Sequence, residues 1–294
     1  MKEDYGYLLI ATASMIWGTM GILGRLAFEY GIQPVTLIAL RILASSLTIL
    51  VPITLIRREF FKIQRKDLPL FLVLGLLGTA LQRIAYFYAI NLTTATIAAV
   101  LFYTYPIFVT IYASILFKEK VTLSTMFAIV LTFSGVALVV KAHETSWLNA
   151  NILGVMFGLF SSILFVFYFL ITKKMRNRYT NWTLILYGDT VSAIALTPVV
   201  FSALPEIANY PQQLWLLIFT IAWFPSLLAY LLYSYALKYV ESSKASILAV
   251  LEPLSAAILS ATILRESFDP LQILGITLAL TGVALLFYKP KVKN

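Results

Sequence analysis

Ten apolar segments, each about 20 residues long, follow one another along the 294-residue chain. They span residues 7–28, 35–56, 68–90, 94–117, 121–140, 150–172, 182–203, 214–237, 243–264 and 269–288. A helix of about 20 residues, rising 1.5 Å per residue, crosses the roughly 30 Å hydrocarbon core of a bilayer. Only 12% of the residues are charged, against roughly 25% in soluble domains. We therefore expect an all-α integral membrane protein with ten transmembrane helices.

The second half of the sequence repeats the first at an offset of 147 residues, which is half the chain length. Identical residues recur at this offset in and beside three pairs of segments: Pro106 and Pro253, Glu119 and Glu266, Gly135–Leu138 and Gly282–Leu285, Tyr86 and Tyr233, and Ala89 and Ala236. The pattern predicts two repeats of five helices, residues 1–146 and residues 147–294. Because five is odd, the second repeat starts on the opposite side of the membrane, so the repeats must be inverted.

The distribution of positive charge predicts an orientation. The even-numbered connections and both chain ends are basic, and the connection at residues 173–178 alone holds four lysines and arginines. The odd-numbered connections and the segment ends beside them hold only three cations, which are Arg25, Lys141 and Arg265. Cytoplasmic loops of membrane proteins carry the excess of Lys and Arg. Both termini are thus predicted to be cytoplasmic, in a multi-pass protein of the cell membrane.

Short motifs add a family resemblance to this pattern. They are Ile-Trp-Gly-Thr-Met-Gly at residues 16–21, Pro34 followed by Ala-Leu-Arg at 39–41, the Tyr-Ala ends of segments three and eight, and the duplicated proline with a glutamate thirteen residues later and Gly-Val-Ala-Leu beyond it. Over the whole chain these motifs resemble the EamA-type ten-helix exporters of the drug/metabolite transporter superfamily. The resemblance implies alternating-access export of small metabolites or amino acids from the cytoplasm. It also implies a central cavity lined mainly by segments one, three, four, six, eight and nine.

Other classes of function find little support in the sequence. It contains no motif of ATP hydrolysis, zinc peptidases or serine hydrolases, no cysteine, and one histidine, His143, in a polar turn. We therefore predict no enzyme activity, no metal and no cofactor. The net charge of +9 lies in short loops, which favours the lipid bilayer and a small-molecule substrate as partners and excludes nucleic acid. A membrane-embedded enzyme or scaffold remains the alternative from another class.

Four charged residues lie deep inside the apolar segments, away from the segment ends: Arg41, Arg83, Asp189 and Glu252. Each costs at least a few kcal/mol in lipid and normally faces the interior of a helix bundle. Arg41 and Asp189 occupy equivalent positions of the two repeats, so inversion places them on opposite sides of the midplane with separate partners. They and Glu252 are candidates for gating or coupling, although Arg41 is equally suited to capping carbonyl groups. The alternative within transport is a nucleotide-sugar or sugar-phosphate exchanger. Such a protein should offer a phosphate more cations than Arg41 and Arg83.

Aromatic residues that share the segments with these charges predict a substrate site. We expect walls formed by Trp17, Tyr86, Tyr103, Tyr230 and Tyr233 to hold the body of a zwitterionic or amphipathic substrate. Arg83 would contact its carboxylate and Glu252 its amine. The competing interpretation for the tyrosines is core packing, and Gly18, Gly21 and Gly24 favour close helix contact over binding.

Three further expectations concern coupling and helix geometry. Asp189 and Glu252 are the intramembrane groups that can change charge, since arginine stays protonated, so any ion coupling is expected to use protons; passive uniport is the alternative. Pro106 and Pro253 each remove a backbone donor and should open their helices. Glu119 and Glu266 are expected to pair with neighbouring cations and with the N-terminal dipoles of the helices that follow.

Overall fold

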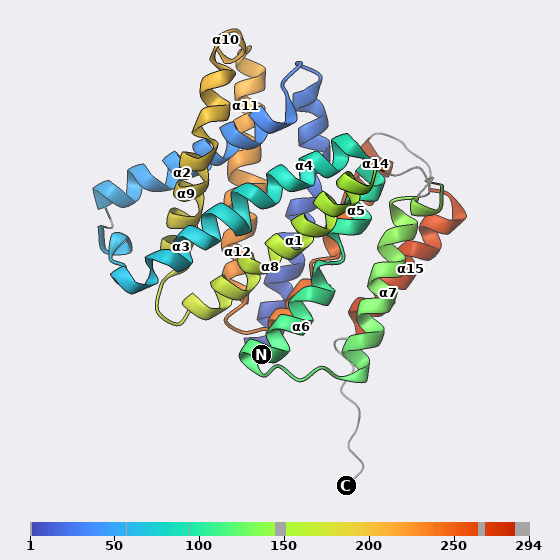
Figure 1. The fold of residues 1–294 in the computed structure, drawn as a ribbon. Coiled ribbons are helices and arrows are strands. Elements are labelled where there is room, and N and C mark those ends of the chain that lie inside the picture. Colours follow the sequence, from blue (N-terminus) through green and yellow to red (C-terminus); the bar gives the residue numbers. More distant parts are fainter. Residues whose placement is uncertain (1, 57, 94, 145–150, 264–267, 286–294) are drawn as a thin grey trace.

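The computed structural model describes residues 2–56, 58–93, 95–144, 151–263 and 268–285, and all ten predicted segments are helical (Figure 1). Six of them are single helices: α1 (Lys2–Phe28), α2 (Pro34–Ile56), α7 (Leu123–Val139), α8 (Ile152–Met175), α9 (Asn181–Ser202) and α15 (Pro270–Leu285). The other four are interrupted: α3 (Leu68–Gly75), η3 (Leu76–Leu81) and α4 (Gln82–Leu92); α5 (Ala95–Phe102) and α6 (Tyr105–Phe117); α11 (Gln212–Ile221), η6 (Ala222–Leu228) and α12 (Ala229–Ala236); α13 (Ser242–Leu248) and α14 (Leu251–Ile263). Short turns η1 (Arg58–Phe61), η2 (Arg65–Asp67), η4 (Ala142–Glu144) and α10 (Leu204–Ile207) lie in the connections.

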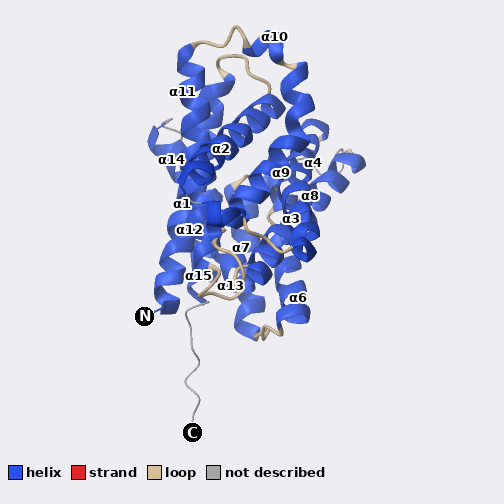
Figure 2. Cartoon of the chain, turned by 90° about the vertical axis from the view of Figure 1, so that its left-hand side faces the viewer, coloured by secondary structure: helices blue, strands red, loops and turns tan. Residues whose placement is uncertain are grey.

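Eight of these helical segments are long and apolar enough to cross a membrane. The other two, α7 and α15, are apolar helices of 17 and 16 residues. They are the fifth helices of the two repeats and pack side by side (Figure 1). Figure 2 shows the described chain as helices and loops, with α10 at one end and the start of α1 at the other. These ends are called outer and inner here, after the predicted orientation.

The contact between α7 and α15 has the symmetry that inverted repeats produce. A Cβ at Gly135 would lie 2.5 Å from the carbonyl oxygen of Gly275, and a Cβ at Gly282 would lie 2.9 Å from the carbonyl oxygen of Ala128. Gly275 and Gly282 are the 147-residue equivalents of Ala128 and Gly135, so the second contact repeats the first with the two helices exchanged. Contacts 135 to 275 and 128 to 282 also require the helices to run antiparallel. A twofold axis between inverted repeats passes through this interface, as predicted.

The two halves of the chain interleave around one core. In the first half, α1 packs along α12 and α14 of the second half, while α8 packs along α4, α5 and α6 of the first. The main cluster of buried residues accordingly takes members from both halves. The predicted division between residues 146 and 147 lies outside the described residues.

Interruptions occur at equivalent places in the two halves. The segments η3 and η6 are π-helical, and residues 223–228 of η6 are the 147-residue equivalents of residues 76–81. Turns at 103–104 and 249–250 separate α5 from α6 and α13 from α14. The turns end two residues before Pro106 and three residues before Pro253, and the missing N–H of each proline cannot continue the helix. Both prolines thus open their helices, as predicted.

Candidate functional site

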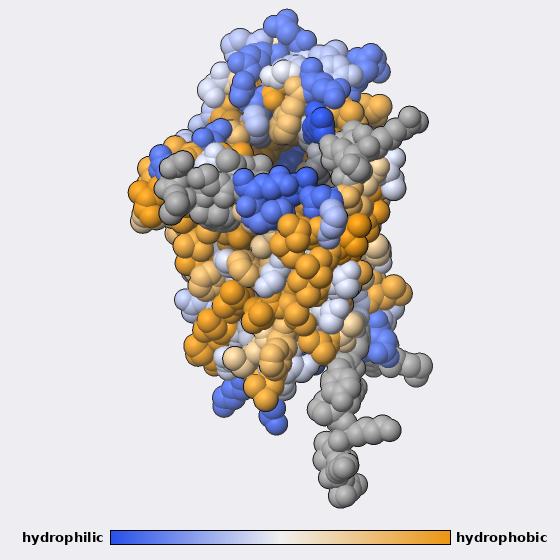
Figure 3. Space-filling model, turned by 90° about the vertical axis from the view of Figure 1, so that its right-hand side faces the viewer, coloured by the Kyte–Doolittle hydropathy of each residue, from blue (hydrophilic) through white to orange (hydrophobic). Residues whose placement is uncertain are grey.

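A cavity of about 930 Å³ lies between α1, α4, α14 and the outer ends of α7 and α15. Trp17, Tyr86, Tyr103 and Glu252 line its deeper part, and Lys141 lies in its outer wall. Figure 3 shows the face that carries α7 and α15, where a hollow opens above a band of hydrophilic residues. The volume is within the range of small-molecule sites, roughly 300–1,000 Å³.

The break before α14 positions the carboxylate of Glu252 in the cavity. Glu252 lies in the first turn of α14, where the dipole of the half-helix favours a negative charge. Among the described lining residues it is the only acid, and Lys141 is the only base. Close packing of α1 holds this turn in place, because a Cβ at Gly18 would lie 2.9 Å from the carbonyl oxygen of Glu252. The site therefore offers a fixed acceptor to a hydrogen-bond donor or a cation.

Three aromatic side chains surround Glu252 in the cavity wall. Trp17 is 6% exposed and its indole Nε1 has no hydrogen-bond partner among the described residues. Behind it lie Tyr230 and Tyr233, with ring centroids 5.0 Å and 5.1 Å from the indole. Tyr86 and Tyr103 line the cavity directly. Two of the five predicted aromatic residues, Tyr230 and Tyr233, thus support the wall and are not among its lining residues.

Arg83 lies in a second, smaller chamber. Its Nη2 donates to Tyr230 Oη at 3.2 Å, and because the two positions are 147-residue equivalents, this bond lies near the pseudo-twofold axis. The chamber has about 20 Å³ and is lined by Arg83, Asp189, Tyr168, Thr172 and Tyr230, among others. Arg83 Nη1, Tyr168 Oη and Thr172 Oγ1 have no partner among the described residues. Such a polar space has room for about one water molecule, and Trp17 with Tyr230 separates it from the main cavity.

Arg41 and Asp189 have separate partners, as predicted. The hydroxyl of Ser45 donates to Asp189 Oδ2 at 2.6 Å. Arg41 Nη1 donates to Ser226 Oγ at 3.1 Å and contacts Met20 Sδ at 3.5 Å. Met20 also lines the cavity, so Arg41 lies directly behind the cavity wall. Ser45 and Ser226 could not be recognised from the sequence, since single serines in apolar helices usually bond their own backbone.

Polar groups at the mouth were also missed by sequence reasoning, because they belong to connections. Lys141 Nζ lies 3.1 Å from Asp269 Oδ2 and 3.7 Å from Glu144 Oε1. Asp269 accepts from the backbone N–H of Gln272 at 2.8 Å, and this bond holds the pKa of Asp269 below its ordinary value. The hydrogen bond to Asp269 raises the pKa of Lys141. The pair ties the end of α7 to the start of α15.

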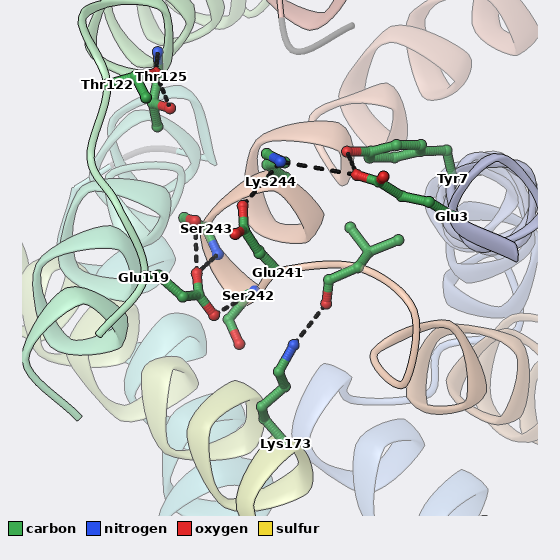
Figure 4. Close-up of polar contacts among 11 residues, drawn as sticks. Glu3, Tyr7, Glu119, Thr122, Thr125, Lys173, Glu241, Ser242, Ser243 and Lys244 are labelled. Atoms are coloured by element: carbon green, nitrogen blue, oxygen red, sulfur yellow. Dashed lines mark hydrogen bonds and ion pairs between the residues drawn. The ribbon is translucent and has the colours of Figure 1, made fainter. Parts of the chain in front are cut away.

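A polar network closes the inner end (Figure 4). Glu119 accepts from the backbone N–H groups of Ser242 and Ser243 at 2.9 Å and 3.1 Å, and from the Ser243 hydroxyl at 2.7 Å. Glu119 thus binds a helix N-terminus, the kind of partner that was predicted, but the helix is α13, 123 residues away, rather than the next helix in the chain. The predicted role of Glu266 concerns a residue outside the described ones.

Two cations complete the closure. Lys173 Nζ, at the end of α8, donates to the carbonyl oxygen of Val240 at 2.7 Å. Lys244 in α13 lies 2.9 Å from Glu241 and 3.8 Å from Glu3 of α1. Helix α1, the end of α6 and helix α8 are thus tied to the first turn of α13 and to the connection before it (Figure 4). The cavity is open toward the outer end and shut toward the inner one.

Comparison with known proteins identifies the family to which this chain is similar. Residues 4–141 and 152–288 each match the EamA-like transporter family. The chain belongs to this family. An uncharacterized transporter of Archaeoglobus fulgidus is 28% identical over 201 residues, covering 68% of this chain and 70% of that protein. The uncharacterized transporter YetK of Bacillus subtilis is 26% identical over 295 residues, covering 99% of this chain and 89% of its own.

A solved crystal structure supports the same fold for this EamA-like transporter. It superposes with a TM-score of 0.77 at 15% sequence identity, covering 95% of this chain and 96% of the other. The resemblance inferred from the motifs is therefore confirmed, and the family is one of transporters rather than enzymes. This chain is a multi-pass membrane transporter, whose expected partners are the bilayer and a small molecule.

Proposed function

We propose that this EamA-like transporter exports small amphipathic metabolites that carry an amino group, amino acids among them, by alternating access. One observation carries the proposal: in a cavity open at one end, the one carboxylate among the described lining residues, Glu252, lies with Trp17, Tyr86 and Tyr103. An ammonium group gains a charge-assisted hydrogen bond from a carboxylate and attraction from aromatic faces. The apolar body of the substrate would pack on the same rings.

Amino acids fit because one basic residue, Lys141, is also among the described lining residues of the cavity. Lys141 lies in the outer wall, paired with Asp269 and Glu144, and a substrate carboxylate would bind it by replacing one of these partners, a role that the sequence analysis assigned to Arg83. A sugar phosphate fits less well, since tight phosphate sites use several cations or a bidentate arginine. Arg41 and Arg83 both lie behind the wall formed by Met20, Trp17 and Tyr230.

The inverted repeats supply the second state of the cycle. In transporters of this architecture, the two access states arise when one repeat or bundle moves against the other around a central site. The inner network of Glu119, Lys173 and Lys244 would have to break for the substrate to enter from the cytoplasm. Proton coupling through Asp189 or Glu252 belongs to the same proposal, with passive uniport as its alternative.

Uptake of radiolabelled amines and amino acids into proteoliposomes tests the proposal. The panel should first be ranked by thermal stabilisation of the purified protein, because a ligand that binds the folded state raises its apparent stability. We expect Glu252→Gln to weaken transport of the selected amine about tenfold or more, since it removes a charge-assisted bond. Arg83→Ala should change the maximal rate more than the apparent affinity. Unchanged transport of every accepted amine by Glu252→Gln would refute the amine assignment.

A further inference from the structure

A second cavity, of about 700 Å³, opens at the inner end of the molecule between the start of α1, the end of α12 and residues 176–182. Its location at helix ends is the depth at which lipid headgroups meet a membrane protein. Among its described lining residues are three cations, Arg176, Arg178 and Lys238, and no acid. The groove is thus a basic pocket in the headgroup region, separate from the transport cavity.

The cations of this groove differ in how far they are neutralised. Arg178 Nη1 forms an ion pair with Asp67 at 3.1 Å. Arg176 stacks over the ring of Tyr235, 5.2 Å from its centroid, and its Nη1 donates to Asn181 Oδ1. Its Nε is buried without a hydrogen-bond partner among the described residues. The guanidinium is thus fixed at the groove with part of its hydrogen-bonding capacity unused.

The other lining residues of the groove are aromatic and apolar. Tyr5, Trp182 and Tyr235 are 50%, 43% and 40% exposed, and Leu9 and Leu231 lie beside them. Tyrosine and tryptophan are the residues that membrane proteins place at the headgroup level. Cations joined to aromatic and leucine side chains match an amphiphile with an anionic head better than a free, fully hydrated anion.

We propose that this groove binds the phosphate headgroup of an anionic phospholipid, with Arg176 and Lys238 as its cations and the acyl chain leaving along the leucines. Basic pockets between transmembrane helices are known to bind such headgroups. A lipid seated here would bridge α1 and α12 to the connection between α8 and α9. It would therefore stabilise the arrangement in which the inner end is closed.

Lipid titration of the purified full-length protein in neutral detergent tests this proposal. Bound lipid is counted by native mass spectrometry with phosphatidylglycerol or phosphatidylcholine. We expect phosphatidylglycerol to bind at least about tenfold more tightly, and the double variant Arg176→Gln with Lys238→Gln to lose roughly that factor. The matched control Lys120→Gln with Lys174→Gln removes the same charge at the same end, from exposed residues outside the groove, and should change affinity less than about twofold.

Three results would overturn the assignment. The first is equal affinity of the wild-type protein for the two lipids. The second is an equal loss in the control variant, which would reduce the effect to general charge. The third is displacement of phosphatidylglycerol by an equal concentration of inorganic phosphate, which would make the groove a site for a free anion. Lys238→Gln alone, at an exposed position, serves if the double variant does not fold, and it should still weaken binding of phosphatidylglycerol.

Discussion

Gly18 and Gly21 of α1, three residues apart, have opposite surroundings. A Cβ at Gly18 would overlap the hydroxyl oxygen of Ser255 and lie 2.9 Å from the backbone nitrogen of Ala256. A Cβ at Gly21 would meet no atom within 4 Å, because Gly21 lines the cavity. Close approach of α1 to α14, beside Glu252, thus depends on residue 18 having no side chain. The sequence-based assignment of these glycines to helix packing holds for Gly18 and not for Gly21.

We expect Gly18→Ala to destabilise the protein by about 1–3 kcal/mol, the usual cost of overpacking against rigid backbone. Gly21→Ala should leave stability unchanged or raise it by up to about 1 kcal/mol, the gain in helix propensity. Denaturant unfolding in detergent measures both variants against the wild-type protein. Equal midpoints for the two alanine variants would show that α14 moves away from α1 at no cost.

Residue types in the sequence identified several residues that line the cavity, but they did not show which side chains contact one another. Glu252, Trp17, Tyr86 and Tyr103 line the cavity, because a carboxylate or a large aromatic ring in a membrane helix usually faces a polar interior. Arg83 lies three residues before Tyr86 yet contacts Tyr230 in the other chamber. The sequence could not separate them, since the packing of Trp17 on Tyr230 divides the two spaces.

At the scale of helices, hydrophobicity located all ten segments but not their interruptions. The thickness of the bilayer sets the length of each segment. A continuous apolar run of that length is therefore visible in the sequence. The π-helical turns at Leu76–Leu81 and Ala222–Leu228 cannot be recognised in this way, because a wider turn alters neither the length of the apolar run nor its composition. Pro225 is the one cue in the second segment, and the first has no proline. Their recurrence at equivalent positions agrees with a role in helix movement, since π-turns are frequent at functional sites.

Another feature at this scale is the cap that Glu119 places on α13. Glu119→Ala leaves two backbone N–H groups of Ser242 and Ser243 without their acceptor, which costs about 1 kcal/mol or more in the inner-closed state. We expect the inner end to open more often, and a thiol introduced by Ser246→Cys to react about fivefold faster with a permeant reagent. Ser246 is fully buried in the closed state.

Two comparisons make the Glu119 result specific. Glu206→Ala removes the same side chain at an exposed position in α10 and should leave the labelling rate unchanged. Glu119→Gln keeps one acceptor and should give an intermediate rate. A labelling rate in Glu119→Ala equal to that of the Ser246→Cys parent would show that the cap does not restrain the inner end.

At the scale of the whole molecule, the inverted symmetry relates the two ends, and the charges of the connections predict which end is cytoplasmic. The native chain lacks cysteine, so single cysteines report the orientation without background. An impermeant reagent applied to intact cells should label His143→Cys, in the outer connection, and leave Arg176→Cys unlabelled. The reverse pattern would place the termini outside and make the proposed direction of export wrong.

The ion pair between Lys141 and Asp269 at the cavity mouth does not change its charge at the pH values where transport is measured. At the mouth, Asp269 has a lowered pKa, so its contribution to the ion pair is complete above its ordinary value of about 3.9 and is lost as pH falls through the lowered one. Lys141 has a raised pKa, so its contribution is complete below about 10.4 and is lost as pH rises through the raised one. The mouth pair is therefore constant between about pH 4 and pH 10. A pH effect on transport in this range must come from other groups.

Asp189 and Glu252 are the groups that we expect to carry the proton. Proteoliposomes with an imposed pH gradient should accumulate the substrate above its equilibrium level, because protonation in one access state and release in the other links the two fluxes. Asp189→Asn or Glu252→Gln should abolish this accumulation, and at least one of them should retain exchange without a gradient. His143→Gln, which alters an exposed loop residue beside Glu144, is the control and should accumulate substrate as the wild-type protein does. Accumulation that never exceeds equilibration at any gradient would reject proton coupling and leave passive uniport.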